Sequence, residues 1–121
     1  MTGEEQQAAG RRILVVEDEV LITMLIETIL EDAGYQVMLA HSVPEALEAI
    51  EQGHVDLAIL DLNLRGQKVY PVAEQLAALG TPFLFATGGG AHDIEGFPGR
   101  PWVGKPFDER ELLSMVAKVL A

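Results

Sequence analysis

The chain contains no cysteine, few basic residues and no long apolar run, and each shortage excludes a class of protein. Without cysteine there is no disulfide framework, zinc–thiolate site or thiol nucleophile. Eight Lys plus Arg against nineteen Asp plus Glu give a net charge of −11, which disfavours nonspecific attraction to nucleic acid or anionic lipid. No stretch approaches the roughly 20 apolar residues that span a bilayer, and residues 1–12 lack the apolar core of a secretory signal. We therefore expect a cytoplasmic protein that binds neither nucleic acid directly nor membrane.

The length and composition of the chain are typical of one packed domain. It has 121 residues, of which 49% are hydrophobic and 22% are charged. A chain of this length buries roughly two-thirds of its unfolded surface in a single core. Residues 1–11 are polar and lack an apolar face, so we expect a flexible N-terminal tail followed by one domain over residues 12–121.

Short apolar runs alternate along this domain with segments of helical periodicity. The runs predict strands at 13–16, 35–40, 55–60, 83–86 and 102–103, and the periodic segments predict helices at 20–33, 43–52, 69–79 and after 108. This alternation is typical of an α/β, doubly wound, five-stranded parallel sheet with helices on both faces. Six glycines and two prolines between residues 88 and 104 predict an irregular region before the fifth strand.

Two helices carry explicit start signals. Ser42 and Glu45 have the spacing of a capping box, with Pro44 in the first helical turn where no amide donor is needed. Asp108 and Glu111 repeat this pattern before the closing helix.

Polar residues end the apolar runs, and parallel strands present such residues at one edge of a sheet. These residues are Glu17, Asp18, Asp61, Thr87 and Lys105. Three converging carboxylates repel one another, and an oxygen-only ligand set suits a hard cation such as Mg²⁺. Taken alone, the first acidic cluster could simply favour the positive end of the following helix. Complementary chemistry at four separate strand ends argues for a functional site instead.

Glu17-Asp18, Asp61-Leu62-Asn63, Thr87 and Lys105-Pro106-Phe107 together resemble the receiver domain of two-component response regulators, over residues 12–120. The resemblance implies a flavodoxin-like fold with a cis peptide between Lys105 and Pro106. It implies that Asp61 is the phosphoacceptor and that Mg²⁺ is bound by Glu17, Asp18, Asp61 and the backbone carbonyl of Asn63. It also implies that Thr87 hydrogen-bonds the phosphoryl group and that Lys105 pairs with it. Trp102 stands where the family has its switch aromatic, although a core or edge tryptophan is an alternative interpretation.

A narrower resemblance lies in the segment from Pro82 to Gly88, Pro-Phe-Leu-Phe-Ala-Thr-Gly, which is similar to the FAT GUY subgroup of receivers. That subgroup is associated with HWE-type histidine kinases. Gly89 departs from its pattern, because the subgroup has an aromatic residue there.

The leading hypothesis is a single-domain response regulator in two-component signal transduction. It would take a phosphoryl group from a histidine kinase onto Asp61 with Mg²⁺, lose it by hydrolysis, and act by contact with an unknown downstream protein or as a phosphate sink. It would not be an enzyme that turns over a substrate. A fragment of a larger regulator would have the same sequence features. The alternatives are an interaction module with a vestigial site and a Mg²⁺-dependent phosphohydrolase.

Overall fold

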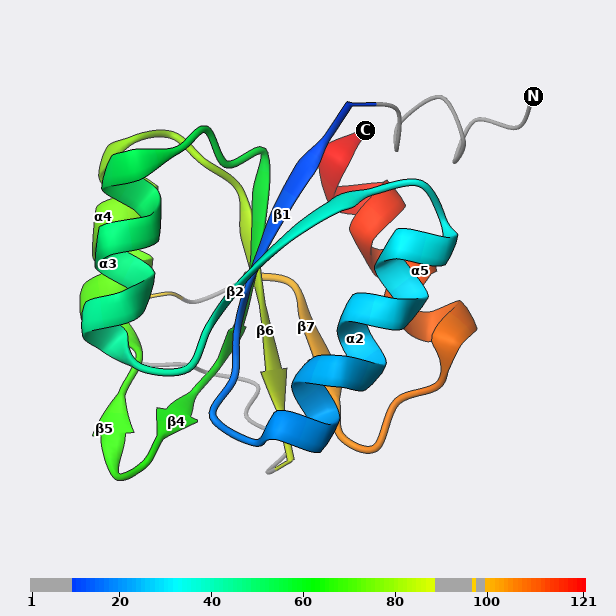
Figure 1. Cartoon of the computed structure of the whole chain (residues 1–121), viewed down its shortest axis with the longest axis horizontal. Helices are drawn as coiled ribbons and strands as arrows, with labels where there is room; N and C mark the ends of the chain where they lie inside the picture. Colours follow the sequence, from blue (N-terminus) through cyan, green and yellow to red (C-terminus); the bar gives the residue numbers. More distant parts are fainter. Residues whose placement is uncertain (1–9, 89–96, 98–99) are drawn as a thin grey trace.

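The computed structural model describes residues 10–88, 97 and 100–121, and over these residues it confirms the doubly wound α/β fold (Figure 1). The central sheet has the strand order β2-β1-β3-β6-β7, and every neighbouring pair in it is parallel. Its strands are β1 (Arg12–Val16), β2 (Gln36–Ala40), β3 (Leu57–Asp61), β6 (Phe83–Thr87) and β7 (Trp102–Gly104). The order reverses between β1 and β3, which is where a doubly wound sheet opens a crevice at the carboxyl ends of its strands.

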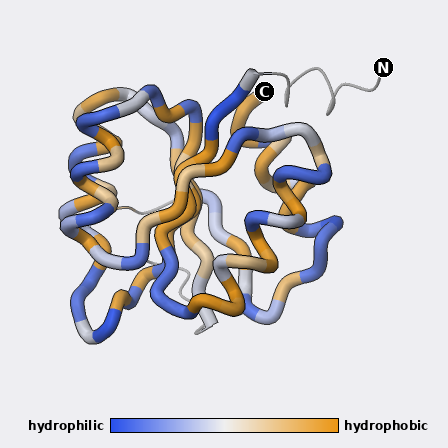
Figure 2. The backbone as a smooth tube through the Cα atoms, in the orientation of Figure 1, coloured by the Kyte–Doolittle hydropathy of each residue, from blue (hydrophilic) through white to orange (hydrophobic). Residues whose placement is uncertain are grey.

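Helices cover both faces of this sheet. Helices α3 (Val43–Gln52) and α4 (Tyr70–Ala78) lie on one side, and α2 (Val20–Asp32) and α5 (Glu109–Leu120) lie on the other (Figure 1). Alternate residues of each strand divide between the two resulting cores: Leu14 packs toward α3 and α4, whereas Ile13 packs toward α2 and α5. The most hydrophobic residues lie in the middle strands, and the helices on both sides carry many hydrophilic residues (Figure 2).

The two predicted helix starts are confirmed. The Ser42 hydroxyl accepts a hydrogen bond from the Glu45 amide at 3.3 Å, and the Asp108 carboxylate accepts one from the Glu111 amide at 2.7 Å. Each bond satisfies one of the amides that a first helical turn leaves without a backbone partner.

One element was not predicted. A two-stranded antiparallel hairpin of β4 (Asn63–Leu64) and β5 (Gln67–Lys68) follows β3 directly. It lies beyond the carboxyl end of the sheet, at the lower left of Figure 1. The sequence gives little sign of it, because each strand has only two residues.

Two predictions fall largely outside the described residues. They are the flexible tail, over residues 1–9, and the irregular region before the fifth strand, over residues 89–96 and 98–99. No helix among the described residues is long and apolar enough to cross a membrane.

Candidate functional site

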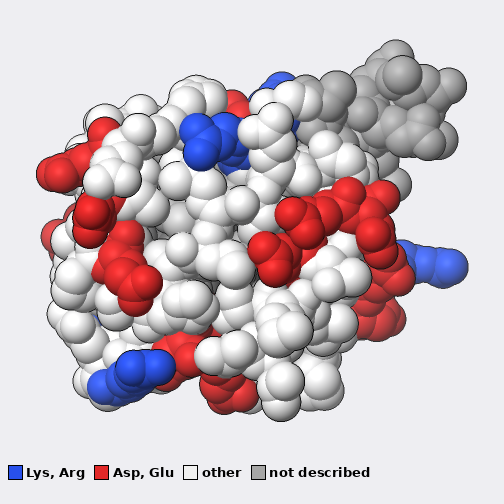
Figure 3. Space-filling model, viewed as in Figure 1, with Lys and Arg blue, Asp and Glu red and all other residues white. Residues whose placement is uncertain are grey.

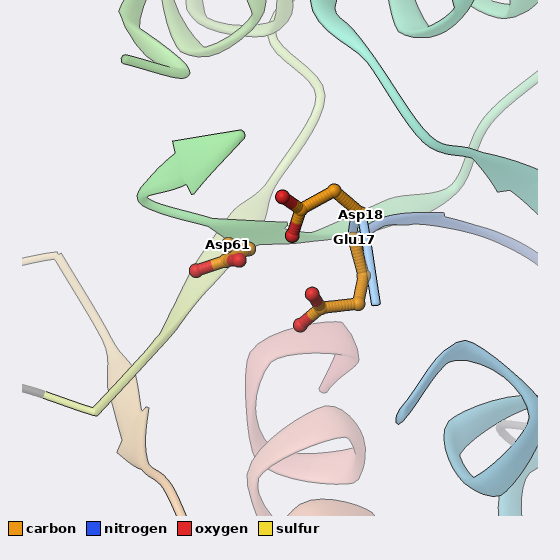
Figure 4. A group of neighbouring side chains, drawn as sticks. All are labelled: Glu17, Asp18 and Asp61. Atoms are coloured by element: carbon orange, nitrogen blue, oxygen red, sulfur yellow. The ribbon is translucent and has the colours of Figure 1, made fainter. Parts of the chain in front are cut away.

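Three carboxylates converge at the carboxyl edge of the sheet. Glu17 and Asp18 directly follow β1, and Asp61 is the last residue of the neighbouring strand β3. The pairing of Val16 with Leu60 brings these strand ends to the same level. One oxygen from each carboxylate lies within 4.8 Å of the others, and the three side chains gather around one region (Figure 4).

Lys105 reaches the same region from the loop after β7. Its Nζ is ion-paired with Oε1 of Glu17 and lies 3.6 Å from Oδ2 of Asp61. Its backbone amide donates to the carbonyl of Thr87 at 2.8 Å, which fixes the loop against the end of β6. One ammonium group therefore faces two of the three carboxylates.

Glu17 is the most enclosed member of the cluster, with only 1% of its surface exposed. A buried carboxylate is costly unless it is paired and hydrogen-bonded. Glu17 meets both conditions, because Oε1 pairs with Lys105 and Oε2 accepts a hydrogen bond from the amide of Glu19 at 3.0 Å.

The electrostatics of Asp61 show that the negative charges are not fully balanced. Burial, followed by the charge of Glu17, raises the pKa of Asp61 to about 6, although Lys105 and the backbone amide of Asn63 oppose the shift. Burial lowers the pKa of Lys105, but its hydrogen bond to Glu17 and the charge of Asp61 outweigh burial, so this pKa lies above its usual value. The ammonium stays charged, and the site retains an excess of negative charge.

The remaining predicted residues lie around this centre. Thr87 ends β6 and is buried, and Asn63 begins the hairpin directly beyond Asp61. The structure thus brings all the strand-end residues to one edge, as predicted. The peptide between Lys105 and Pro106 is cis, which confirms that prediction as well. One contact at this edge was not predicted: the backbone amide of Arg65 donates to Oδ2 of Asp18 at 2.9 Å. The only sequence signal for this contact was Gly66, the second turn residue of the hairpin.

The comparisons with known proteins agree with this geometry. The family described as the response regulator receiver domain matches residues 13–117. The chain is 35% identical over 116 residues to the uncharacterized transcriptional regulatory protein YbdJ of Bacillus subtilis (strain 168). This match covers 92% of this chain and 51% of YbdJ. The chain spans about half the length of the curated relatives it matches.

Solved structures with the same architecture include matches of nearly equal length. The solution structure of SdrG from Sphingomonas melonis Fr1 is 43% identical with a TM-score of 0.80, and the match covers 92% of this chain and 97% of SdrG. The crystal structure of the response regulator TrrA from Thermotoga maritima, in complex with Mg²⁺ and BeF, is 30% identical with a TM-score of 0.81. That match covers 90% of this chain and 98% of TrrA.

Proposed function

The chain belongs to the response regulator receiver domain family, and from that premise we propose that Asp61 accepts a phosphoryl group from the phosphohistidine of a kinase. The observation that carries this proposal is the placement of Asp61 at the strand-end crevice, with an ammonium group 3.6 Å away and two further carboxylates beside it. A carboxylate nucleophile, a cationic partner for phosphoryl oxygens and a metal-binding acidic pair are the parts that phosphoryl transfer requires.

The donor set fits Mg²⁺. Its side chains offer carboxylate oxygens only, which are the ligands of a hard cation, and the raised pKa of Asp61 shows an excess of negative charge that a cation would relieve. Glu17, Asp18 and Asp61, with the backbone carbonyl of Asn63, are the residues that would hold the ion. TrrA, the relative solved with Mg²⁺ and BeF, gives independent support. When bound, Mg²⁺ supplies positive charge that stabilises the phosphoryl oxygens during transfer.

The proposed transfer exchanges one bond at phosphorus for another. An oxygen of the Asp61 carboxylate forms a P–O bond while the P–N bond to the donor imidazole breaks, and the imidazole leaves with its electron pair and takes up a proton. Asp61 must be ionised to attack. A pKa of about 6 leaves most molecules ionised at pH 7. Lys105 neutralises charge on the phosphoryl oxygens, and attack by water later returns Asp61 to its starting form.

Phosphorylation would change the charge balance of the site. It replaces one negative charge with nearly two and adds acceptor oxygens. Lys105 already lies beside Asp61, and Thr87 offers a hydroxyl at the end of the adjacent strand β6. We propose that these two residues move to the phosphoryl group, and that their displacement is read by a downstream protein.

The surface beside the site supports a protein phosphodonor. Four large apolar side chains at the start of α2 are exposed, of which Leu21 is the most open at 81%; the others are Val20, Met24 and Leu25. Leu25 also borders a hollow of about 300 Å³, whose lining includes Lys105 and Phe107. An apolar surface next to the phosphoacceptor is suited to binding a helix of a partner protein. Hydrolysis of a small substrate does not require an exposed apolar patch of this kind.

We further propose, from the similarity of residues 82–88 to the FAT GUY subgroup, that the kinase is of the HWE type.

The apolar patch at the start of α2 is tested as the docking surface with two phosphodonors. Leu21→Ser should slow transfer from a phosphorylated HWE-type kinase while leaving phosphorylation by acetyl phosphate unchanged. Equal transfer to the variant and the natural protein would show that this patch is not the docking surface.

The first experiment is intact mass spectrometry after incubation with acetyl phosphate, with Mg²⁺ or with EDTA. The expected result is a gain of one phosphoryl group that requires Mg²⁺ and is absent in Asp61→Asn. Glu74→Gln, a matched loss of one carboxylate on the exposed side of α4, should gain the group normally. No gain from acetyl phosphate or from a phosphorylated kinase would support the vestigial interaction module instead.

A further inference from the structure

The β4–β5 hairpin has a turn geometry that its sequence does not favour. Its two turn residues, Arg65 and Gly66, have φ of +51° and +83°, as a two-residue type I′ turn requires. Gly66 adopts this conformation at little cost. Arg65 is the only non-glycine residue with positive φ in the described part of the chain, and arginine rarely occupies this region.

This unusual conformation aims a backbone donor at the acidic cluster. The amide of Arg65 donates to Oδ2 of Asp18 at 2.9 Å, across 47 residues of sequence. At the other end of β4, the backbone of Asn63 lowers the pKa of Asp61, although burial and the charge of Glu17 outweigh this effect. The hairpin therefore holds Asp18, whereas Glu17 is held separately by Lys105 and by the amide of Glu19.

The hairpin is fixed to the body of the protein. Leu64 is 2% exposed and lies in the core beneath α3 and α4, together with Val69, which follows the hairpin. The amide of Val69 also donates to the carbonyl of Leu62 at 3.0 Å and closes the base of the hairpin. The turn can therefore act as a rigid support for Asp18, whose side chain has no other hydrogen bond within the described residues.

The side chain of Arg65 plays no part in this contact and is exposed to solvent. Basic groups occur in a few separate places on the face seen in Figure 3, and one lies at the lower left, where Figure 1 shows the hairpin. A positive charge near an acidic cation site opposes cation binding, so the charge of Arg65 gives no reason for its position. The contact with Asp18 instead uses the backbone amide, a donor that every residue except proline has.

We propose that Arg65 is a positioning residue for the Mg²⁺ site, acting through its backbone amide, which holds the Asp18 carboxylate ready to bind the ion. This inference rests on the proposed function, because it assumes that the acidic cluster binds Mg²⁺. Loss of a hydrogen bond that orients a metal ligand typically weakens metal affinity 10- to 100-fold. The contact here is open to solvent, so we expect the lower end of that range.

The test compares two variants that lose the same charge. Arg65→Pro removes the amide donor and cannot adopt positive φ, whereas Arg65→Asn keeps the donor and creates the Asn-Gly pair that type I′ turns favour. Mg²⁺ affinity is measured by isothermal titration calorimetry. We expect Arg65→Pro to bind roughly 10-fold more weakly than Arg65→Asn, and Arg65→Asn to bind at least as tightly as the natural protein. Equal affinity of the two variants would overturn the inference.

A second pair guards against misfolding of the proline variant. A Cβ atom added at Gly66 would meet nothing within 4 Å, so the φ of +83° is the main constraint on substitutions there. Gly66→Val should weaken Mg²⁺ binding, because a β-branched residue resists positive φ, and Gly66→Asn should not. A merely structural role would lower the melting temperature in EDTA without changing affinity. If the natural protein itself fails to bind Mg²⁺, the proposed metal site fails and the inference fails with it; normal binding with unaffected variants refutes the inference alone.

Discussion

Removing the charge of Asp61 should stabilise the metal-free protein, although the residue is the proposed phosphoacceptor. Asp61 has a pKa of about 6 in the folded protein, against 3.8 for an unperturbed side chain, because burial and the charge of Glu17 disfavour its ionised form. The folded state therefore holds this proton more tightly than the unfolded state. It follows that the contribution of Asp61 lowers the free energy of unfolding as the pH rises between about 4 and 6, and that this loss is complete above that window.

The size of the effect follows from the same values. The difference between 3.8 and about 6 corresponds to about 3 kcal/mol of unfavourable free energy once Asp61 is ionised. Solvent reaches the site, so we expect roughly half of that, about 1.5 kcal/mol. Asp61→Asn keeps the shape of the side chain and removes the charge. In a domain of this size, that gain corresponds to a rise in melting temperature of about 4–8 °C.

The assay is urea unfolding in EDTA at pH 8 and at pH 5, followed by circular dichroism. Asp61→Asn should be the more stable protein at pH 8, and about half of its advantage should be gone at pH 5, where the natural Asp61 is largely protonated in the folded state. Glu74→Gln serves as the control for general charge reduction, because Glu74 lies on the exposed side of α4. An Asn variant no more stable than the natural protein at pH 8, or an advantage independent of pH, would refute this account of the site.

Three further predictions concern the same edge of the sheet and one helix start. Mg²⁺ at 100 times its dissociation constant should raise the free energy of unfolding by about 2.7 kcal/mol in the natural protein, and Asp18→Asn should lose most of this gain in thermal melts. Lys105→Met should move the pKa of Asp61 above 6, because the ammonium that opposes the shift is removed; an unchanged carboxyl titration by ¹³C NMR would contradict the pairing. Asp108→Ala should cost about 1 kcal/mol of stability through loss of the helix cap, and a urea midpoint equal to that of the natural protein would show that the cap contributes nothing.

Much of the fold could be predicted because its signals are local. The apolar runs of β1 and β3 and the caps at Ser42 and Asp108 depend on nearest neighbours in the chain, and the structure confirms each of them. The convergence of Asp61 with the residues after β1 was also predictable, since parallel strands end at a common edge. The family motifs added the cis peptide before Pro106.

The sequence by itself therefore determined the fold class, the strand ends that carry polar chemistry and the excess of acidic charge. Only the tertiary structure decided how those charges are distributed: that Lys105 pairs with Glu17 while lying 3.6 Å from Asp61, and that the amide of Arg65 holds Asp18. The physical reason is distance along the chain. These contacts join residues 88, 44 and 47 positions apart. Hydrophobic periodicity also cannot predict a hydrogen bond from the backbone amide of a turn residue with positive φ.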